Sequence, residues 1–162
     1  MASQASAQEV EIYLVDMLDN IQSGYCIDIA GGREADADPK DGLQAHTCYS
    51  PGGKLGVDQT FSTETFAENQ LYMTKFDVCA QAESLEAGSP ISLHTCDNSL
   101  TQSFDFSATG QILPSSDTSL CVTAGEGTRF GRSKRNQIKS LSLQPCAPEN
   151  ASLQTWAARS SL

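Results

Sequence analysis

Three copies of one sequence pattern follow one another along this chain. Each copy has an apolar residue and a cysteine, then an apolar-x-x-(His/Gln)-x-Cys stretch, then a Gln-x-aromatic triplet. The first cysteines of successive copies lie 53 and 42 residues apart, so the copies differ mainly in loop length. A period near 50 residues constrains architecture more firmly than local propensity does. The pattern therefore predicts one fold built from three similar units. The copies contain Tyr25-Cys26, Leu43 to Cys48 and Gln59-Thr60-Phe61; Val78-Cys79, Ile91 to Cys96 and Gln102-Ser103-Phe104; and Leu120-Cys121, Leu141 to Cys146 and Gln154-Thr155-Trp156.

Length and charge limit the classes of function. A chain of 162 residues with 39% hydrophobic content is expected to form a single domain, with repeats at roughly 10–62, 63–107 and 108–157. No apolar run reaches membrane-spanning length, and Met1 to Gln8 lacks the features of a signal peptide. A net charge of −10 argues against nucleic acid and anionic membranes as partners, because both attract cationic surfaces.

The six cysteines fall two to a repeat. The members of each pair are 22, 17 and 25 residues apart, and the repeat symmetry singles out Cys26–Cys48, Cys79–Cys96 and Cys121–Cys146 among the possible pairings. Each bridge would close one loop and stabilise the fold by about 3 kcal/mol. The cysteines do not have the CxxC or Cys/His spacing of a zinc site. The plainer alternative to disulfides is that the cysteines are buried free thiols in a cytosolic protein. We favour disulfides and therefore a secreted, extracellular protein.

The local pattern is all-β. Short β-prone segments alternate with Gly, Pro, Asp, Asn and Ser clusters, which favours a closed barrel or a sandwich. Three copies favour a barrel with pseudo-threefold symmetry, in which Phe61, Phe104 and Trp156 are equivalent core residues. The Gln two positions before each aromatic is expected to hold the backbone. The expected strands include Glu11 to Val15, Tyr25 to Ile29, Leu71 to Met73, Ile91 to His94, Leu120 to Thr123 and Leu141 to Leu143.

These landmarks resemble the ricin B-type lectins, a β-trefoil family that binds sugars. The resemblance rests on Cys26-Ile27-Asp28, on Leu43 to Cys48 and on the three Gln-x-(Phe/Trp) motifs, and it spans residues 10 to 157. It implies a β-trefoil of twelve strands, six in a barrel and six in a cap, with one saccharide pocket available in each repeat. It also implies binding without a metal or other cofactor.

The first repeat carries the residue types of a galactose site in this family. The resemblance implies that the site residues are Asp28, Gln44, His46, Asp58 and Gln59. A carboxylate such as Asp28 accepts charge-assisted hydrogen bonds from two neighbouring hydroxyls, while a flat ring covers the C–H face of the sugar. His46 stands where Trp is commonest, and Asp58 stands where Asn is commonest. The plainer reading makes Asp28 a turn residue before Gly31-Gly32.

The second and third repeats lack the acid. Gln81 and Thr123 occupy the position of Asp28, and neither offers a charged bidentate acceptor. His94 matches His46, which indicates that this histidine is partly structural. We therefore expect one functional pocket, specific for terminal galactose or N-acetylgalactosamine, in the first repeat. The remaining equivalents of its site residues are Ser92, Thr101, Gln144 and Leu153.

A basic segment falls outside the family pattern. Five of the ten basic residues stand within eleven positions of this acidic chain. A solvated, protease-sensitive loop is the simplest interpretation. The alternative is that the segment recognises a sulfate, sialate or uronate on a larger glycan. The five residues are Arg129, Arg132, Lys134, Arg135 and Lys139.

Catalysis is not expected. The two histidines stand at equivalent places in separate repeats, so no catalytic triad can be assigned. Asp28 and Asp58 could pair for glycoside hydrolysis, but sugar-binding pockets of this kind are too shallow to exclude water. The serious alternative is a protease inhibitor or another protein-binding module that uses the exposed loop Gly125 to Gln137. A single weak sugar site needs multivalency, so a homodimer or an attached module is expected.

Overall fold

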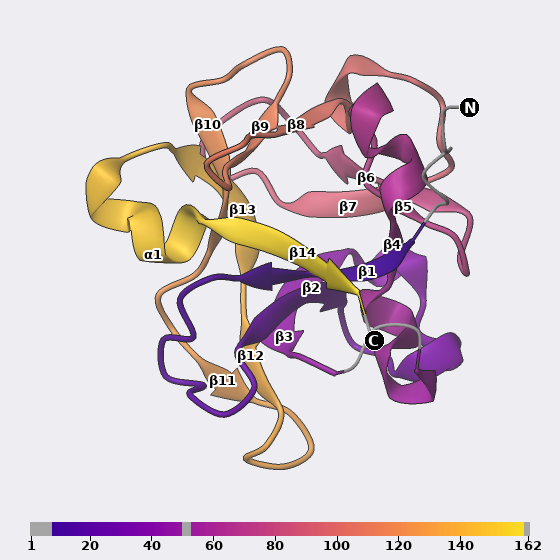
Figure 1. Cartoon of the computed structure of the whole chain (residues 1–162), viewed down its shortest axis with the longest axis vertical. Helices are drawn as coiled ribbons and strands as arrows, with labels where there is room; N and C mark the ends of the chain where they lie inside the picture. The colour runs from indigo at the N-terminus through magenta and orange to yellow at the C-terminus, as the bar shows by residue number, and fades with distance from the viewer. Residues whose placement is uncertain (1–7, 50–52, 161–162) are drawn as a thin grey trace, which may run out of the picture.

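The chain folds almost entirely into short strands and tight turns (Figure 1). The computed structural model describes residues 8–49 and 53–160, so the expectations for residues 1–7 and for the middle of the loop after Tyr49 lie outside the described residues. Within this part there are fourteen strands and one short helix, α1 (Ala151–Gln154). The strands are β1 (Glu9–Leu14), β2 (Tyr25–Ile29), β3 (Leu43–Thr47), β4 (Phe61–Ser62), β5 (Tyr72–Met73), β6 (Val78–Ala82), β7 (Ile91–His94), β8 (Phe104–Phe106), β9 (Ile112–Pro114), β10 (Leu120–Ala124), β11 (Arg129–Phe130), β12 (Gln137–Lys139), β13 (Leu141–Pro145) and β14 (Trp156–Ser160). Short 3-10 helices of one or two turns cover Glu34–Asp36, Pro39–Asp41, Lys54–Gln59, Thr63–Glu68, Leu100–Gln102 and Pro148–Asn150.

Twelve of these strands form the expected β-trefoil, with four from each repeat. The first repeat supplies β1 to β4, the second β5 to β8, and the third β9, β10, β13 and β14. Hairpins β2–β3, β6–β7 and β10–β13 hold the cysteines and form the cap, while the other six strands form the barrel. Strand β1 is central, because it pairs with β2, β4 and β14. The predicted all-β trefoil with three repeats is confirmed.

The remaining two strands are an insertion in the third repeat. Strands β11 and β12 form a hairpin between β10 and β13, in the basic segment. Strand β12 continues the sheet of the first repeat by pairing with β3, with Ile138 opposite His46 and Lys139 opposite Ala45 (Figure 1). The basic segment is thus partly a β-hairpin fixed to the first repeat, and not simply a solvated loop.

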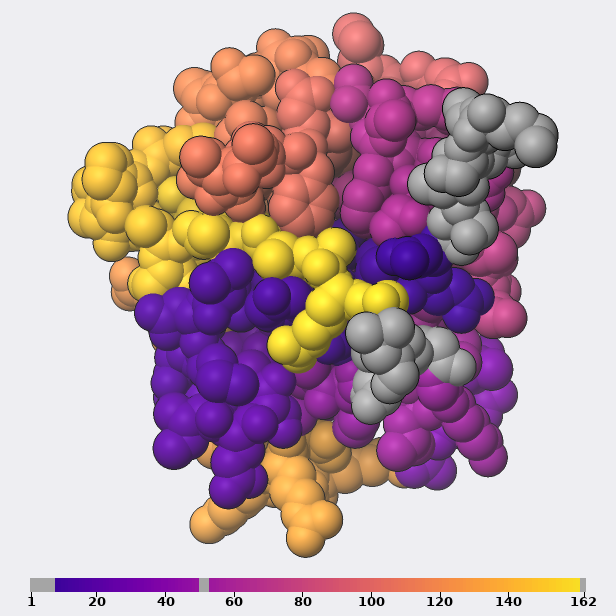
Figure 2. Space-filling model, in the orientation of Figure 1, coloured from indigo at the N-terminus to yellow at the C-terminus, as the bar shows by residue number. Residues whose placement is uncertain are grey.

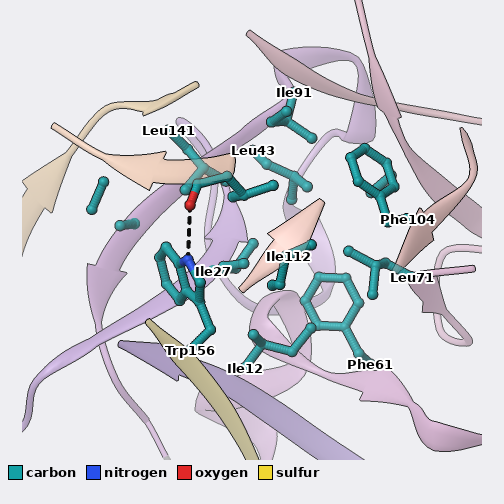
Figure 3. Close-up of a cluster of buried hydrophobic side chains, with 14 of the residues drawn as sticks. Ile12, Ile27, Leu43, Phe61, Leu71, Ile91, Phe104, Ile112, Leu141 and Trp156 are labelled. Atoms are coloured by element: carbon teal, nitrogen blue, oxygen red, sulfur yellow. Dashed lines mark hydrogen bonds between the residues drawn. The ribbon is translucent and has the colours of Figure 1, made fainter. Parts of the chain in front are cut away.

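The three motif aromatics meet in the core, as predicted. Phe61, Phe104 and Trp156 are each 1% exposed and point into one apolar cluster (Figure 3). The indole N–H of Trp156, the one polar side-chain atom of these three aromatics, donates to the carbonyl of Val122 at 3.0 Å. The core thereby joins the barrel strands of all three repeats.

The motif glutamines make the same three hydrogen bonds in every repeat. Each side-chain amide donates to the carbonyl of the residue before the second cysteine and to the side chain two residues after the first cysteine, and each accepts from the backbone N–H after the second cysteine. These glutamines are buried, so the bonds hold the cap onto the barrel. The side-chain acceptors are Asp28 for Gln59, Gln81 for Gln102 and Thr123 for Gln154.

Three disulfides join the cysteines as the repeat symmetry predicts. The bridges are Cys26–Cys48, Cys79–Cys96 and Cys121–Cys146, and every cysteine of the chain is used. Each bridge closes one cap hairpin of its own repeat. In the described residues no helix has the length and apolar character to cross a membrane.

Candidate functional site

A pocket of about 730 Å³ opens between the first repeat and the inserted hairpin. The first repeat contributes residues of β2, of β3, of the turn after β2 and of the loop after β3. The hairpin, which pairs with β3, contributes the wall next to that strand. The lining residues are Asp28, Gly31, Gly32, Arg33, Glu34, Asp36, Gln44, His46, Tyr49, Leu55, Asp58, Arg129, Gly131, Arg132, Asn136 and Ile138.

The floor of the pocket is one face of a four-stranded ribbon. The strands run in the order β11–β12–β3–β2, and Arg129 lies opposite Ile138, which lies opposite His46. Asp28 lies opposite Gln44, and Gln44 is two residues before His46 on β3. Directly opposed residues and residues two apart share one face of a sheet. All five side chains therefore project to the same side, and all five line the pocket.

Asp28 brings a buried carboxylate to this floor. The residue is 3% exposed, and its Oδ2 receives the side-chain amide of Gln59 at 3.4 Å. Its Oδ1 has no hydrogen-bond partner among the described residues. Burial raises the pKa of Asp28 well above its usual range, the negative charge of Asp58 raises that pKa further, and the amides of Gln44 and Gln59 oppose the rise. A buried acceptor without a donor is costly, so this oxygen is poised to accept one.

Asp58 is a second buried carboxyl of the same pocket. It is 3% exposed, and its Oδ1 also lacks a partner among the residues described. Burial raises the pKa of Asp58 from 3.8 to about 6, against the effect of backbone N–H groups of Asp58 and Glu34. Two coupled carboxyls thus face one cavity, each with an oxygen left for a hydroxyl donor.

Two rings stand beside these acids. The rings of His46 and Tyr49 lie 5.7 Å apart between centroids, tilted by 33°. The His46 Nδ1 lies 2.9 Å from the carbonyl of Thr47 and 3.6 Å from Asp28 Oδ2, and burial lowers the pKa of this imidazole. The Tyr49 hydroxyl donates to Asn136 Oδ1 at 2.9 Å, on the inserted hairpin. A neutral ring pair is therefore fixed at the wall.

Four of the five predicted site residues line the pocket. Asp28, Gln44, His46 and Asp58 surround the cavity, whereas Gln59 is fully buried behind them and is not part of the lining. Its amide reaches the pocket only through Asp28, which makes Gln59 a positioning residue in this geometry. In the loop that follows β3, Tyr49 lines the cavity, whereas Lys54 does not and forms a 3.9 Å ion pair with Glu34.

The turn after β2 forms the acidic rim. Gly32 lines it, and a Cβ at this glycine would lie 2.5 Å from the Cα of Ala37, so only glycine allows the turn to close this tightly. The same turn carries Glu34, with a positive φ of 53°, and Asp36. Arg33 is the one basic residue that the turn adds to the rim.

The register of the other two repeats places neutral residues where the first has its acid. Gln81 lies opposite Ser92 and Thr123 opposite Ser142, just as Asp28 lies opposite Gln44. Gln81 and Thr123 accept the motif-glutamine bond with 3.0 Å distances. The structural task at this position therefore requires only a neutral acceptor, and the charge of Asp28 needs another explanation.

The hairpin wall was not expected from the pattern of the first repeat. Arg129, Arg132, Asn136 and Ile138 come from the third repeat, about a hundred positions along the chain from Asp28. The sequence marked this segment by its basic residues but gave no sign of its pairing with β3. Lys139, the fifth basic residue, is instead 3% exposed and donates to the carbonyls of Gly125, Glu126 and Gly127.

Comparison with known proteins gives a consistent family and fold. The model of the ricin-type beta-trefoil lectin domain matches residues 15–156. The C-half of an earthworm R-type lectin, solved in complex with GalNAc, superposes with a TM-score of 0.66 at 14% identity, covering 95% of this chain and 99% of that one. The agglutinin of Abrus precatorius gives a TM-score of 0.68 at 15% identity, covering 98% and 50%.

A bacterial lectin domain has the same fold. The β-trefoil lectin of the Vibrio vulnificus hemolysin/cytolysin, with N-acetyl-D-lactosamine bound, gives a TM-score of 0.63 at 10% identity and covers 98% of each chain. No curated protein sequence matches the chain significantly. At these sequence identities the structural similarity shows the fold alone.

Proposed function

Because this chain belongs to the ricin-type β-trefoil lectin family, we propose that it binds terminal galactose or N-acetylgalactosamine, reversibly and without catalysis, through one pocket in the first repeat. The observation that carries the proposal is the unpartnered Oδ1 of Asp28, buried at the floor of that pocket. The equivalent residues Gln81 and Thr123 are neutral. The earthworm lectin solved with GalNAc supports the choice of sugar.

The pocket offers four contacts that suit a monosaccharide. Asp28 offers its Oδ1 as an acceptor for a sugar hydroxyl, and this hydrogen bond is stronger when the carboxyl is ionised. Gln44 adds a neutral amide next to it, opposite in the strand register. The rings of His46 and Tyr49 supply a surface for the apolar face of the sugar. Asp58 offers its free oxygen to a further hydroxyl.

Binding without reaction is what this geometry supports. Glycoside hydrolysis needs a pair of carboxyls on opposite sides of the scissile bond, in a site that controls water. Here both acids lie at the base of the pocket, and much of the rim, including Arg33, Asp36 and Arg132, is exposed to solvent. We assign the acids to recognition. The three disulfides favour an extracellular setting for it.

The test is a glycan array probed with the wild type and with the Asp28→Asn variant at physiological salt. Asn keeps the acceptor for Gln59 and removes the charge, so the variant is expected to fold and to lose binding to galactose-type glycans by at least tenfold. The matched control is Gln81→Asn, at the same register position of the second repeat, which should bind as the wild type does.

Thermal unfolding of each variant separates lost recognition from lost folding. Galactose-type binding that survives in a folded Asp28→Asn variant would move the site elsewhere. Silence of the wild type across the array would overturn the lectin function and leave the exposed hairpin as a protein-binding element.

A further inference from the structure

We propose that the pocket selects glycans that carry an anionic group, a carboxylate or a sulfate, and that Arg129 and Arg132 of the inserted hairpin bind this group beside the sugar. The inference rests on the proposed function, because the anion is recognised as part of a glycan whose hydroxyls face Asp28. Both arginines line the pocket.

The hairpin that carries the two arginines is attached to the first repeat. Strand β12 pairs with β3, and Thr47 Oγ1 donates to the carbonyl of Arg135 at 2.8 Å and accepts from the backbone N–H of Gln137 at 2.9 Å. The hydrogen bond from Tyr49 to Asn136 ties the turn to the first repeat. The hairpin is therefore a preorganised wall, which lowers the entropic cost of binding.

The charges of these arginines are not neutralised within the protein. Neither Arg129 nor Arg132 has an acidic side chain within 4.0 Å in the described part of the chain. The Arg129 guanidinium makes one long contact, from Nη2 to Gln44 Oε1 at 3.4 Å, which directs it toward the sugar-binding floor. Its other N–H groups stay available, and a guanidinium presents a fork suited to carboxylate and sulfate oxygens.

The pocket is electrically divided in a way that orients such a ligand. The side of the first repeat carries four carboxyls and one guanidinium and is therefore acidic on balance, whereas the hairpin side carries only the guanidinium groups of Arg129 and Arg132; the first-repeat residues are Asp28, Asp58, Glu34, Asp36 and Arg33. An anionic substituent is repelled by the acidic side and attracted by the hairpin side. A neutral sugar would use only one side of this pocket. A glycan with one anionic substituent next to its galactose-type residue uses both.

The experiment compares neutral lactose with 3′-sulfolactose, 3′-sialyllactose and 6′-sialyllactose by titration calorimetry at 0.15 M salt. The wild type is expected to bind at least one anionic glycan about tenfold more tightly than lactose, and the preferred glycan identifies sulfate or carboxylate as the group bound. The double variant Arg129→Gln/Arg132→Gln should lose the preference, measured as the ratio of its affinities for the anionic glycan and for lactose.

The matched control removes the same charge from the same hairpin. Lys134 and Arg135 are exposed and do not line the pocket, so Lys134→Gln/Arg135→Gln should keep the preference. If this control loses the preference as fully as the pocket variant, general attraction by a basic hairpin explains the effect, and the assignment to Arg129 and Arg132 is overturned.

The outcome also separates this inference from the proposed function. Equal affinity of the wild type for lactose and all three anionic glycans would reject the anion site and leave the galactose-type site standing. Failure to bind any of the four glycans would reject both.

Discussion

Asp28 combines a structural hydrogen bond with a side-chain oxygen that the fold leaves unused. Its Oδ2 does the work that Gln81 and Thr123 do in the other repeats, which is to receive the amide of the motif glutamine. Its Oδ1 has no partner among the described residues. A buried carboxylate with an unused oxygen is less stable than a neutral acceptor of similar size. We therefore propose that a ligand, and not the fold, accounts for a carboxyl at this position.

Asp58 gives the first repeat a testable pH dependence. Its pKa in the folded protein is about 6, above the 3.8 of an unperturbed Asp, so the folded state binds this proton more tightly than the unfolded state does. The contribution to stability is full below pH 3.8 and is lost as the pH rises through 6. Asp58→Asn is therefore expected to stabilise the protein at pH 7, by at most about 3 kcal/mol, the free-energy equivalent of that pKa change.

Urea unfolding at pH 4, 5, 6 and 7 measures this effect. The gain from Asp58→Asn should shrink toward pH 4, where Asp58 is itself largely neutral. Asp36→Asn is the control, because Asp36 is an exposed carboxyl on the rim of the same pocket and should change stability by no more than about 0.5 kcal/mol. A gain from Asp58→Asn that does not vary with pH would show that ionisation of this carboxyl is not the cause.

Among the elements, the inserted hairpin adds most to what the repeat pattern predicts. The repeats predicted strands, cap hairpins and disulfides because each is a local consequence of a recurring pattern. The pairing of β12 with β3 joins segments of different repeats and depends on contacts such as those of Thr47, which no sequence period marks. The basic residues indicated a special segment, and only the tertiary structure shows that two of them, Arg129 and Arg132, line the pocket (Figure 2 shows the hairpin projecting from the body of the molecule).

Thr47 should therefore control the attachment of the hairpin. Its hydroxyl contacts the side chain of Asn20, the carbonyl of Arg135 and the N–H of Gln137. Thr47→Val keeps the shape and removes these bonds, at a cost of about 1 to 3 kcal/mol for the groups left unpaired. Brief exposure to trypsin should then cleave after Lys134 or Arg135 faster than in the wild type, since both residues are exposed at the turn.

The second repeat supplies a matched control. Thr95 stands where Thr47 stands in the pattern, but it is exposed, and no hydrogen bond of its hydroxyl is found in the described structure. Thr95→Val should leave cleavage at Lys134 and Arg135 unchanged. Equal cleavage rates for the wild type and Thr47→Val would mean that the strand pairing alone holds the hairpin.

At the scale of the whole molecule, the three repeats share a fold but differ in the residues at the position of Asp28. Phe61, Phe104 and Trp156 fill equivalent core positions, and their preceding glutamines make equivalent bonds. The sequence predicted this symmetry because core and clamp residues recur. It also predicted that Asp28 makes the first repeat unlike the others. It did not predict that Gln59 lies behind the pocket, because a linear motif does not separate residues that line a cavity from residues that support them.

This asymmetry predicts one saccharide per chain. In a nuclear magnetic resonance titration with lactose, shifted amide signals should cluster around Asp28, Gln44 and His46, and one site should fit the data with a dissociation constant of about 0.1 to 10 mM, as expected for a small ligand that buries little surface. Signals near Gln81 and Thr123 should stay in place, since these residues lack the acid. Saturable shifts there would show that a neutral acceptor suffices.

If the single site is correct, binding to cell surfaces requires two or more linked copies, and we expect agglutination only under conditions in which the chain self-associates or is attached to another module.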